Sequence, residues 1–100
     1  MKRAIMMNSE DNVATALEKL DEGSLIRVDS SSQENVKDVT AKQAISFGHK
    51  IAVIAIMKGD NVVKYGAVIG SASHNIEPGD YVHVHNVISN RMQMPEIWYR

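Results

Sequence analysis

The hydrophobic residues of this chain follow a strand-like pattern most clearly between residues 48 and 86. Apolar, β-branched runs occupy residues 51–56, 61–65, 67–72 and 81–87, and turn-forming Gly, Pro and Asp residues separate them. Val and Ile suit the pleated surface of a sheet, whereas Gly, Pro and Asp readily adopt the backbone angles of tight turns. The pattern therefore predicts a compact unit of short strands joined by short connections.

The residues before this unit predict one helix and one hairpin. The helix is expected over residues 13–20, where an amphipathic stripe at positions i, i+3, i+4 and i+7 consists of Val13, Ala16, Leu17 and Leu20. Polar residues able to cap a helix precede it, and Gly23 follows it. Residues 24–28 and 34–40 predict a hairpin with a polar tip. The helix would cover one face of the strand unit.

Two shorter segments complete this expectation. Residues 2–7 are a candidate edge strand, and residues 41–47 predict a short helical turn. Phe47, the single Phe of the chain, is expected to fill the core. One hundred residues suggest one domain, and no internal repeat is expected.

Alternation gives the last predicted strand two different faces. Side chains along a strand point to opposite faces in turn, so Tyr81, His83 and His85 share one face, and Val82 and Val84 share the other. The valine face is expected to join the core. The histidine face would then look toward solvent, a partner or a ligand.

Composition and charge exclude several classes of function. The net charge of -1 gives no electrostatic reason to bind nucleic acid or an anionic membrane. No apolar run approaches the roughly 20 residues of a membrane span, and no signal peptide follows the first Met, so we expect a cytoplasmic protein. The sequence has no Cys, which excludes disulfides, thiolate nucleophiles, iron–sulfur ligation and cysteine-based zinc sites.

Three short motifs at fixed spacing carry a family resemblance. They are GHK at residues 48–50, KYG at residues 64–66 and VHVHN at residues 82–86, with glycines and apolar residues between them. Together with DNVA at residues 11–14, the pattern closely resembles the SAF-type β-clip domain of the altronate and galactarate dehydratase family, over residues 4–90. In that family the domain also occurs as a separate small subunit, for instance in sulfolactate sulfo-lyase. The resemblance implies a β-clip, SAF-like fold, which is mainly β with one short helix.

The resemblance also implies that the chain is the small subunit or N-terminal domain of a sugar-acid dehydratase-type lyase. Such an enzyme eliminates water, or sulfite from sulfolactate, from a small hydroxy acid. The family's divalent, iron-like metal belongs to the large subunit or domain, so this chain is expected to bind no cofactor alone and to be inactive alone. Residues 1–90 would form the domain and residues 91–100 a tail toward that partner, with Trp98 and Tyr99 suited to an interface.

A second class of function stays open, namely a stand-alone sugar-acid-binding module without catalysis. Related β-clip domains occur in such proteins, but the KYG and VHVHN motifs match the lyase branch. Assembly of the chain into a homo-oligomer is compatible with either function.

The polar residues of the three motifs are the candidate site. We predict that His83 and His85 are catalytic. The residues predicted to bind substrate are His49, Lys50, Lys64, Tyr65 and Asn86. Imidazole, ammonium and phenol groups can bind the carboxylate of a hydroxy acid or move its protons. Two other interpretations of His83 and His85 stay open, a metal-binding pair and a structural role, and no metal site is assigned. His74 is treated as an ordinary surface residue.

Overall fold

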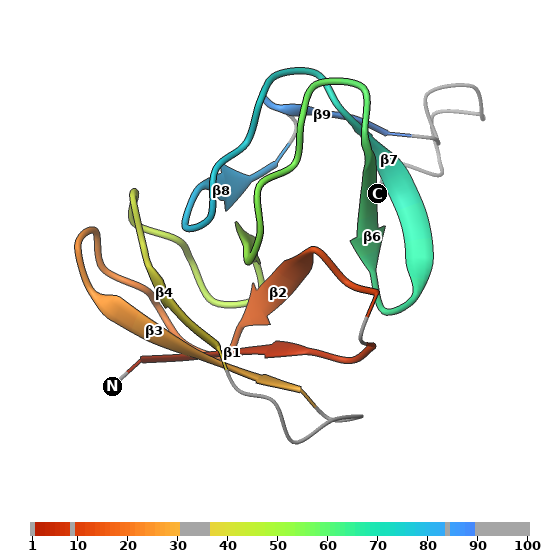
Figure 1. The fold of residues 1–100 in the computed structure, drawn as a ribbon. Coiled ribbons are helices and arrows are strands. Elements are labelled where there is room, and N and C mark those ends of the chain that lie inside the picture. The colour runs from red at the N-terminus through yellow and green to blue at the C-terminus, as the bar shows by residue number, and fades with distance from the viewer. Residues whose placement is uncertain (1, 9, 31–36, 84, 90–100) are drawn as a thin grey trace.

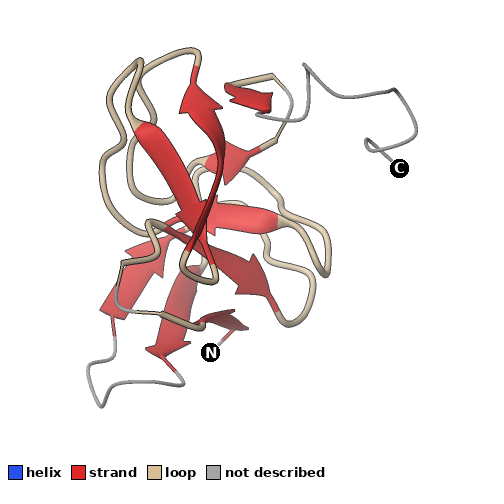
Figure 2. Ribbon diagram, turned by 90° about the vertical axis from the view of Figure 1, so that its right-hand side faces the viewer, coloured by secondary structure: helices blue, strands red, loops and turns tan. Residues whose placement is uncertain are grey.

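The fold consists of strands, bridges and turns throughout the part of the chain that the structure describes. The computed structural model describes residues 2–8, 10–30, 37–83 and 85–89. Its strands are β1 (Lys2–Met6), β2 (Val13–Ala16), β3 (Leu25–Ser30), β4 (Lys37–Thr40), β5 (Lys50–Ala52), β6 (Asn61–Lys64), β7 (Ala67–Ala72), β8 (Tyr81–Val82) and β9 (Val87–Ser89). Figure 1 shows β1, β3 and β4 on one side of the molecule and β6, β7 and β9 on the other. Figure 2 shows only strands and loops in the described residues, so the prediction of a mainly β fold is confirmed. None of these residues forms a helix that could cross a membrane.

Two sheets make up the fold. Six strands form the larger sheet in the order β4-β3-β1-β2-β5-β8, and three strands form the smaller one in the order β6-β7-β9. β1 and β3 pair in parallel, and the other neighbouring strands pair antiparallel. The antiparallel pairing of β3 with β4, with Leu25 opposite Thr40, confirms the predicted hairpin. The tip of this hairpin at residues 31–36 lies outside the described residues.

The larger sheet has a hydrophobic core on each of its two faces. The first core contains Ala4, Ala14, Ala16, Leu20, Ile26, Val28, Val39, Ala41, Ile45, Ile51 and Val53. The second contains Val13, Ala52, Ile56, Val62, Ala72, Ile76 and Val82. Successive residues of one strand enter different cores, as Ile51 and Ala52 do on β5. Strands near the middle of the sheet are therefore covered on both faces, and burial of each Val, Leu or Ile side chain contributes about 1.5–3 kcal/mol.

An eleven-residue pattern occurs four times in the chain, so the expectation of no internal repeat is wrong. Each copy reads Ala-x3-Leu/Ile-x2-Gly-x2-Ile/Val, and the copies cover residues 16–26, 41–51, 52–62 and 72–82. Every copy follows the same backbone course, with a bend, an isolated bridge, a tight turn and then a strand. The copies begin at unequal intervals, and for this reason a search for a fixed period does not find them.

Backbone hydrogen bonds join the four copies into two pairs. Leu20 and Ile45 donate N–H bonds of 2.8 Å to each other's carbonyl oxygens, and Ile56 and Ile76 exchange bonds of 2.8 and 2.7 Å. All four side chains are buried. The repeated apolar position is therefore a bridge that holds two turns together.

The helix predicted over residues 13–20 is absent, because Val13–Ala16 forms strand β2. β2 lies between β1 and β5 and is covered by a core on each face, so its apolar residues are buried without helical spacing. Leu17 is 42% exposed, and Leu20 is the bridge residue of the first copy. The apparent helical stripe thus combines a doubly buried strand with the start of a repeat.

The helical turn predicted at residues 41–47 is also wrong, since this segment begins the second copy of the repeat. Phe47 lies in the tight turn of that copy and is 70% exposed, so it does not fill the core. Glu22, Lys58 and Pro78 hold the same place in the other copies and are exposed as well. This position of the repeat therefore faces away from both cores.

Candidate functional site

Three histidines and a tyrosine meet where β5 and β8 pair. This pairing brings His49 next to His83, just beyond the paired residues, with their ring centroids 5.3 Å apart. His49 Nδ1 shares a hydrogen bond with the Tyr81 hydroxyl. The Tyr81 ring centroid lies 5.5 Å from that of His83 and 5.7 Å from that of His85. These four residues are termed the ring cluster.

A turn after β8 brings His85 back to Tyr81. The sequence predicts a strand through residue 87, but β8 contains only Tyr81–Val82. The buried Asn86 holds the turn, because its side-chain oxygen accepts a 2.9 Å bond from the His83 N–H and its Nδ2 donates a 2.7 Å bond to the Tyr81 carbonyl oxygen. The position of His85 beside Tyr81 therefore comes from a turn and not from strand alternation.

The two faces of β8 differ less than alternation predicts. Val82 is buried in the second core, as expected, and Val84 lies outside the described residues. The other face is not simply open, because Tyr81 is partly buried against the first core. His83 and His85 are exposed, which leaves their imidazoles accessible to a substrate or partner.

Two lysines and a tyrosine form a second polar group beside β2. Lys50 lies opposite Thr15 in the sheet, and the Thr15 hydroxyl shares a 3.0 Å hydrogen bond with the Tyr65 hydroxyl. The Lys64 ammonium lies 4.9 Å from the centroid of the Tyr65 ring, within reach of a cation–π contact. Burial lowers the pKa of Lys50, and the positive charge of Lys64 lowers it further. Lys50, Lys64 and Tyr65 are termed the lysine group.

The predicted site residues lie on two faces of β5 and do not form one compact cluster. Tyr81 lies opposite Ile51 and shares its face, whereas Lys50 precedes Ile51 and points to the other face. The ring cluster and the lysine group therefore flank the start of β5 from opposite sides. They are still linked electrostatically, because the pKa of His83 is lowered first by burial, then by the neighbouring His49 and then by the Lys50 ammonium.

This electrostatic environment suits an anionic substrate. The charges that lower the pKa values of Lys50 and His83 are all positive. A lowered pKa keeps His83 neutral near neutral pH, so its imidazole can accept a proton. A bound carboxylate would offset the repulsion between the cations. Positive charge attracts acidic ligands, and a neutral imidazole is a group that can accept a proton.

A buried carboxylate positions Tyr65. The φ angle of Tyr65 is 54°, in the left-handed region that residues other than glycine rarely adopt. Asp11, 4% exposed, accepts a 2.7 Å bond from the Gly66 N–H with one oxygen. Its other oxygen accepts bonds of 3.0 and 3.1 Å from the N–H groups of Met7 and Asn8. Sequence analysis places Asp11 among helix-capping residues, but it ties two turns together, and the DNVA motif is the one signal that marks it.

Sequence analysis also missed a shallow pocket of about 280 Å³ beside Tyr81. Its walls include Gln43, His74, Asn75, Asp80, Tyr81 and His85. His74, expected to be an ordinary surface residue, thus shares a pocket with the predicted catalytic His85. Gln43 and Asn75 carry no motif, so only the tertiary structure brings them into the site.

The described residues do not fit a metal ion. Among them, no three His, Asp or Glu side chains converge closely enough to hold one. His83 of the ring cluster lies within the field of the Lys50 ammonium, and this positive charge disfavours a divalent cation. We therefore derive no step of this chain's chemistry through a metal.

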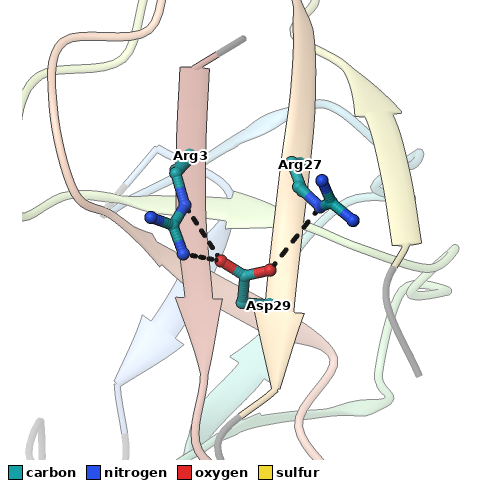
Figure 3. A network of polar contacts seen from close by, with 3 residues as sticks. All are labelled: Arg3, Arg27 and Asp29. Atoms are coloured by element: carbon teal, nitrogen blue, oxygen red, sulfur yellow. Dashed lines mark hydrogen bonds and ion pairs between the residues drawn. The ribbon is translucent and has the colours of Figure 1, made fainter. Parts of the chain in front are cut away.

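A third polar cluster, separated from the site by β2, has a structural explanation. Figure 3 shows Asp29 between Arg3 of β1 and Arg27 of β3. Arg3 Nε donates a 3.0 Å bond to Asp29 Oδ2, and Arg27 Nε lies 3.8 Å from Asp29 Oδ1. The arginine side chains are 58% and 52% exposed, and ion pairs at such positions contribute about 0–1 kcal/mol. This cluster links two parallel strands and has no assigned chemistry.

Known proteins similar to this chain are of two kinds. Altronate dehydratase of Escherichia coli (strain K12) is 40% identical over 96 residues, which cover 96% of this chain and 18% of that enzyme. Altronate dehydratase of Bacillus subtilis (strain 168) is 39% identical over 90 residues, which cover 90% of this chain and 17% of that enzyme. The (2R)-sulfolactate sulfo-lyase subunit alpha of Chromohalobacter salexigens is 30% identical over 88 residues, which cover 87% of this chain and 94% of that subunit. The chain thus spans less than a fifth of the dehydratases but nearly all of the subunit.

The family itself follows from a match along most of the chain. The family model for the altronate/galactarate dehydratase SAF domain matches residues 2–90. This range contains all the motifs on which the resemblance rests, so the predicted family is confirmed. The chain belongs to the SAF-domain family of altronate and galactarate dehydratases.

Proposed function

We propose that this chain is the small subunit or N-terminal domain of a sugar-acid dehydratase-type lyase and contributes residues to a substrate cleft shared with a large catalytic partner. The observation that carries the proposal is the meeting of His49, Tyr81, His83 and His85 where β5 pairs with β8, beside Lys50 of β5. The relatives support it, since one is a dehydratase matched over 18% of its length and another is a separate subunit matched over 94%.

The proposed chemistry is an elimination from a hydroxy acid. A proton leaves one carbon, the bond between the neighbouring carbon and its leaving group breaks, and a C=C bond forms. The leaving group takes the electron pair of the broken bond, and it departs as water after protonation of the hydroxyl, or as sulfite. His83, neutral because of its lowered pKa, accepts the proton from carbon, and His85 donates a proton to the leaving hydroxyl.

The lysine group holds the carboxylate of the substrate in this proposal, which requires the substrate to pass around the start of β5 to reach the ring cluster on the other face. Ammonium–carboxylate contacts are charge-assisted, and the bound anion offsets the repulsion between Lys50 and Lys64. His49, oriented by the Tyr81 hydroxyl, adds a further donor. Contact of Asn86 with substrate stays a prediction, since its side chain already holds the turn after β8. A divalent, iron-like metal is proposed for the large partner alone, and a cytoplasmic location also stays a prediction.

The test is turnover by the assembled enzyme, which is this chain with its large subunit or the full-length protein if both are one chain. His83→Gln and His85→Gln should each lower kcat about 10²-fold or more, without a change in the circular dichroism spectrum. Glu22→Gln, at an exposed turn position of the first copy, is the control and should keep full turnover. Full activity of both histidine variants would overturn the proposal. Binding of a hydroxy acid without any turnover by the assembled protein would instead indicate a binding module.

A further inference from the structure

The pocket beside Tyr81 carries polar groups that the proposed elimination does not use. Its volume of about 280 Å³ is slightly below the roughly 300–1,000 Å³ of typical ligand pockets, so it suits one part of a small molecule. The pocket shares Tyr81 and His85 with the ring cluster. A molecule bound in it would therefore extend directly toward the predicted catalytic residues.

Two amide side chains of the pocket are held in fixed orientations. The Gln43 side-chain oxygen accepts a 2.8 Å bond from the Tyr81 N–H, and the Asn75 side-chain oxygen accepts a 2.8 Å bond from the Lys58 N–H. Because an amide accepts a backbone N–H bond only through its oxygen, these bonds determine which end of each amide remains available. Both NH₂ groups are left without a hydrogen-bond partner among the described residues, so they can donate to a ligand.

Acceptor and imidazole groups complete the lining. Asp80 uses one carboxylate oxygen to accept a 2.8 Å bond from the Glu77 N–H, which leaves its other oxygen as an acceptor. His74 shares a 2.9 Å bond with the Ser73 hydroxyl through Nδ1, which leaves Nε2. Tyr81 adds a large aromatic side chain. The pocket thus combines oriented donors, an acceptor and an aromatic residue.

This combination matches the chemistry of a polyhydroxylated carbon chain. Each hydroxyl both donates and accepts, so neighbouring hydroxyls can use the amide donors and the Asp80 acceptor together. The C–H groups of such a chain can pack on an aromatic ring. The negative charge of Asp80 disfavours a carboxylate or sulfonate in the same pocket. A neutral polyol segment therefore fits better than the acidic end of a substrate.

We propose that this pocket is the subsite for the hydroxylated tail of a sugar acid. The inference rests on the proposed function, because the cationic groups around the start of β5, with His49 on the same face as Tyr81, must bind the carboxylate at the other end of the same molecule. It adds a substrate preference, since a three-carbon hydroxy acid has no tail to place in the pocket. The enzyme should therefore favour a hexonate over a three-carbon acid, and Gln43 and Asn75 should determine that preference.

Two conservative variants test the subsite while keeping the backbone bonds. Gln43→Glu and Asn75→Asp retain the oxygen that accepts the backbone N–H and replace the ligand-facing NH₂ with oxygen. Ala44→Glu adds the same charge at an exposed neighbouring position and is the control. In the assembled enzyme, each pocket variant should raise KM for the hexonate about tenfold, the effect of roughly one lost hydrogen bond, with kcat unchanged. The inhibition constant of lactate, a three-carbon hydroxy acid, should stay the same, and the control should resemble the unmodified enzyme.

A binding measurement separates failure of the subsite from failure of the lyase function. Sorbitol is a neutral polyol without a carboxylate, and it should shift the side-chain amide NMR signals of Gln43 and Asn75 in this chain. Those shifts together with full activity of His83→Gln and His85→Gln would overturn the lyase function and support the subsite. Two outcomes would overturn the subsite: amide signals unmoved by sorbitol both in the chain alone and in the assembled protein, or variants that weaken hexonate and lactate binding equally.

Discussion

Substituting Gly79 with Ala tests whether the fourth copy of the repeat is packed as the structure shows. A Cβ at Gly79 would lie 2.0 Å from the Thr40 carbonyl oxygen, far inside contact distance. Gly79 also has a φ of 95°, which an L-residue adopts only at a cost. Gly59 holds the same place in the third copy with a φ of 92°, and a Cβ there would meet no described atom within 4 Å. Gly59→Ala therefore has the backbone cost without the steric clash.

The two costs can be estimated separately. A left-handed backbone at Ala costs about 1–2 kcal/mol, and both variants should show this loss. Relief of the clash requires Thr40 or the turn to move, and overpacking of this kind costs about 1–3 kcal/mol. The movement also weakens the 2.9 Å bond from the Lys42 N–H to the Gly79 carbonyl oxygen, which contributes about 1 kcal/mol. The free energy of unfolding should thus fall by about 1–2 kcal/mol for Gly59→Ala and about 3–6 kcal/mol for Gly79→Ala.

Urea unfolding followed by far-ultraviolet circular dichroism measures both values. Equal m-values would show that the variants expose the same surface on unfolding. Because 1 kcal/mol corresponds to about 4–8 °C in Tm for a domain of this size, thermal unfolding of the same two variants should give Tm values that differ by about 10–30 °C. A Gly79→Ala protein that does not fold, beside a folded Gly59→Ala protein, would agree with the same reasoning. Equal losses of stability would refute it, because Gly79 would then be no more crowded than Gly59.

Three further predictions concern the site and its support. Asp11→Asn should lower the free energy of unfolding, measured in urea, by about 1–3 kcal/mol, because an amide NH₂ would face a backbone N–H that the carboxylate now accepts. Lys64→Met should raise the pKa of Lys50 in an NMR titration of its Cε signal, because it removes a positive charge that lowers this pKa. The pKa of His83 should lie below 6.5 by NMR. The unfolded state then binds the proton first as pH falls, so stability should rise with pH between the folded pKa and about 6.5, and less so in His83→Gln.

Matched variants and contrary outcomes apply to each of these predictions. Asp60 makes a single exposed turn bond through its side chain, so Asp60→Asn should cost less than about 0.5 kcal/mol, and an equal loss in both aspartate variants would contradict the buried role. Lys58→Met, at an exposed lysine of the third copy, should leave the pKa of Lys50 unchanged. An unshifted Lys50 in Lys64→Met would disprove the coupling between these lysines. A His83 pKa of 6.5 or above would contradict its cationic environment.

Strand positions could be predicted from the sequence because local chemistry determines them. The runs expected at residues 61–65 and 67–72 match β6 (Asn61–Lys64) and β7 (Ala67–Ala72) to within one residue, since glycine turns bound them. The helix predicted over residues 13–20 was wrong because β2 is buried on both faces. Apolar residues at helical spacing indicate a helix only when a single face of the segment is buried. Coverage of β2 on both faces depends on the packing of two sheets, which no local pattern reveals.

The candidate site was predictable only in part, for the same reason. The motifs identified the histidines, and alternation correctly made Val82 a core residue. Which side chains meet, however, depends on the pairing of β5 with β8. The bond between Tyr81 and His49 joins two different copies of the repeat. Gln43 lies in the bend of the second copy and Asn75 directly after the bend of the fourth, so they reach the same pocket only through the tertiary structure.

Comparison of the four copies, all within the described residues, explains why the site lies where it does. The residue after the turn glycine is Ser24, His49, Asp60 or Asp80. Asp60 and Asp80 accept bonds of 3.2 and 2.8 Å from the N–H that opens their turns, and the Ser24 hydroxyl donates to a carbonyl of its own turn. Within the described residues His49 makes no such bond, and its side chain reaches the Tyr81 hydroxyl instead. The side chain after the turn glycine thus bonds to its own turn in three copies, whereas in the second copy it is available for another contact. Because β5 and β8 pair the second copy with the fourth, the His49 imidazole meets Tyr81 at the junction between copies, and the proposed chemistry is located there.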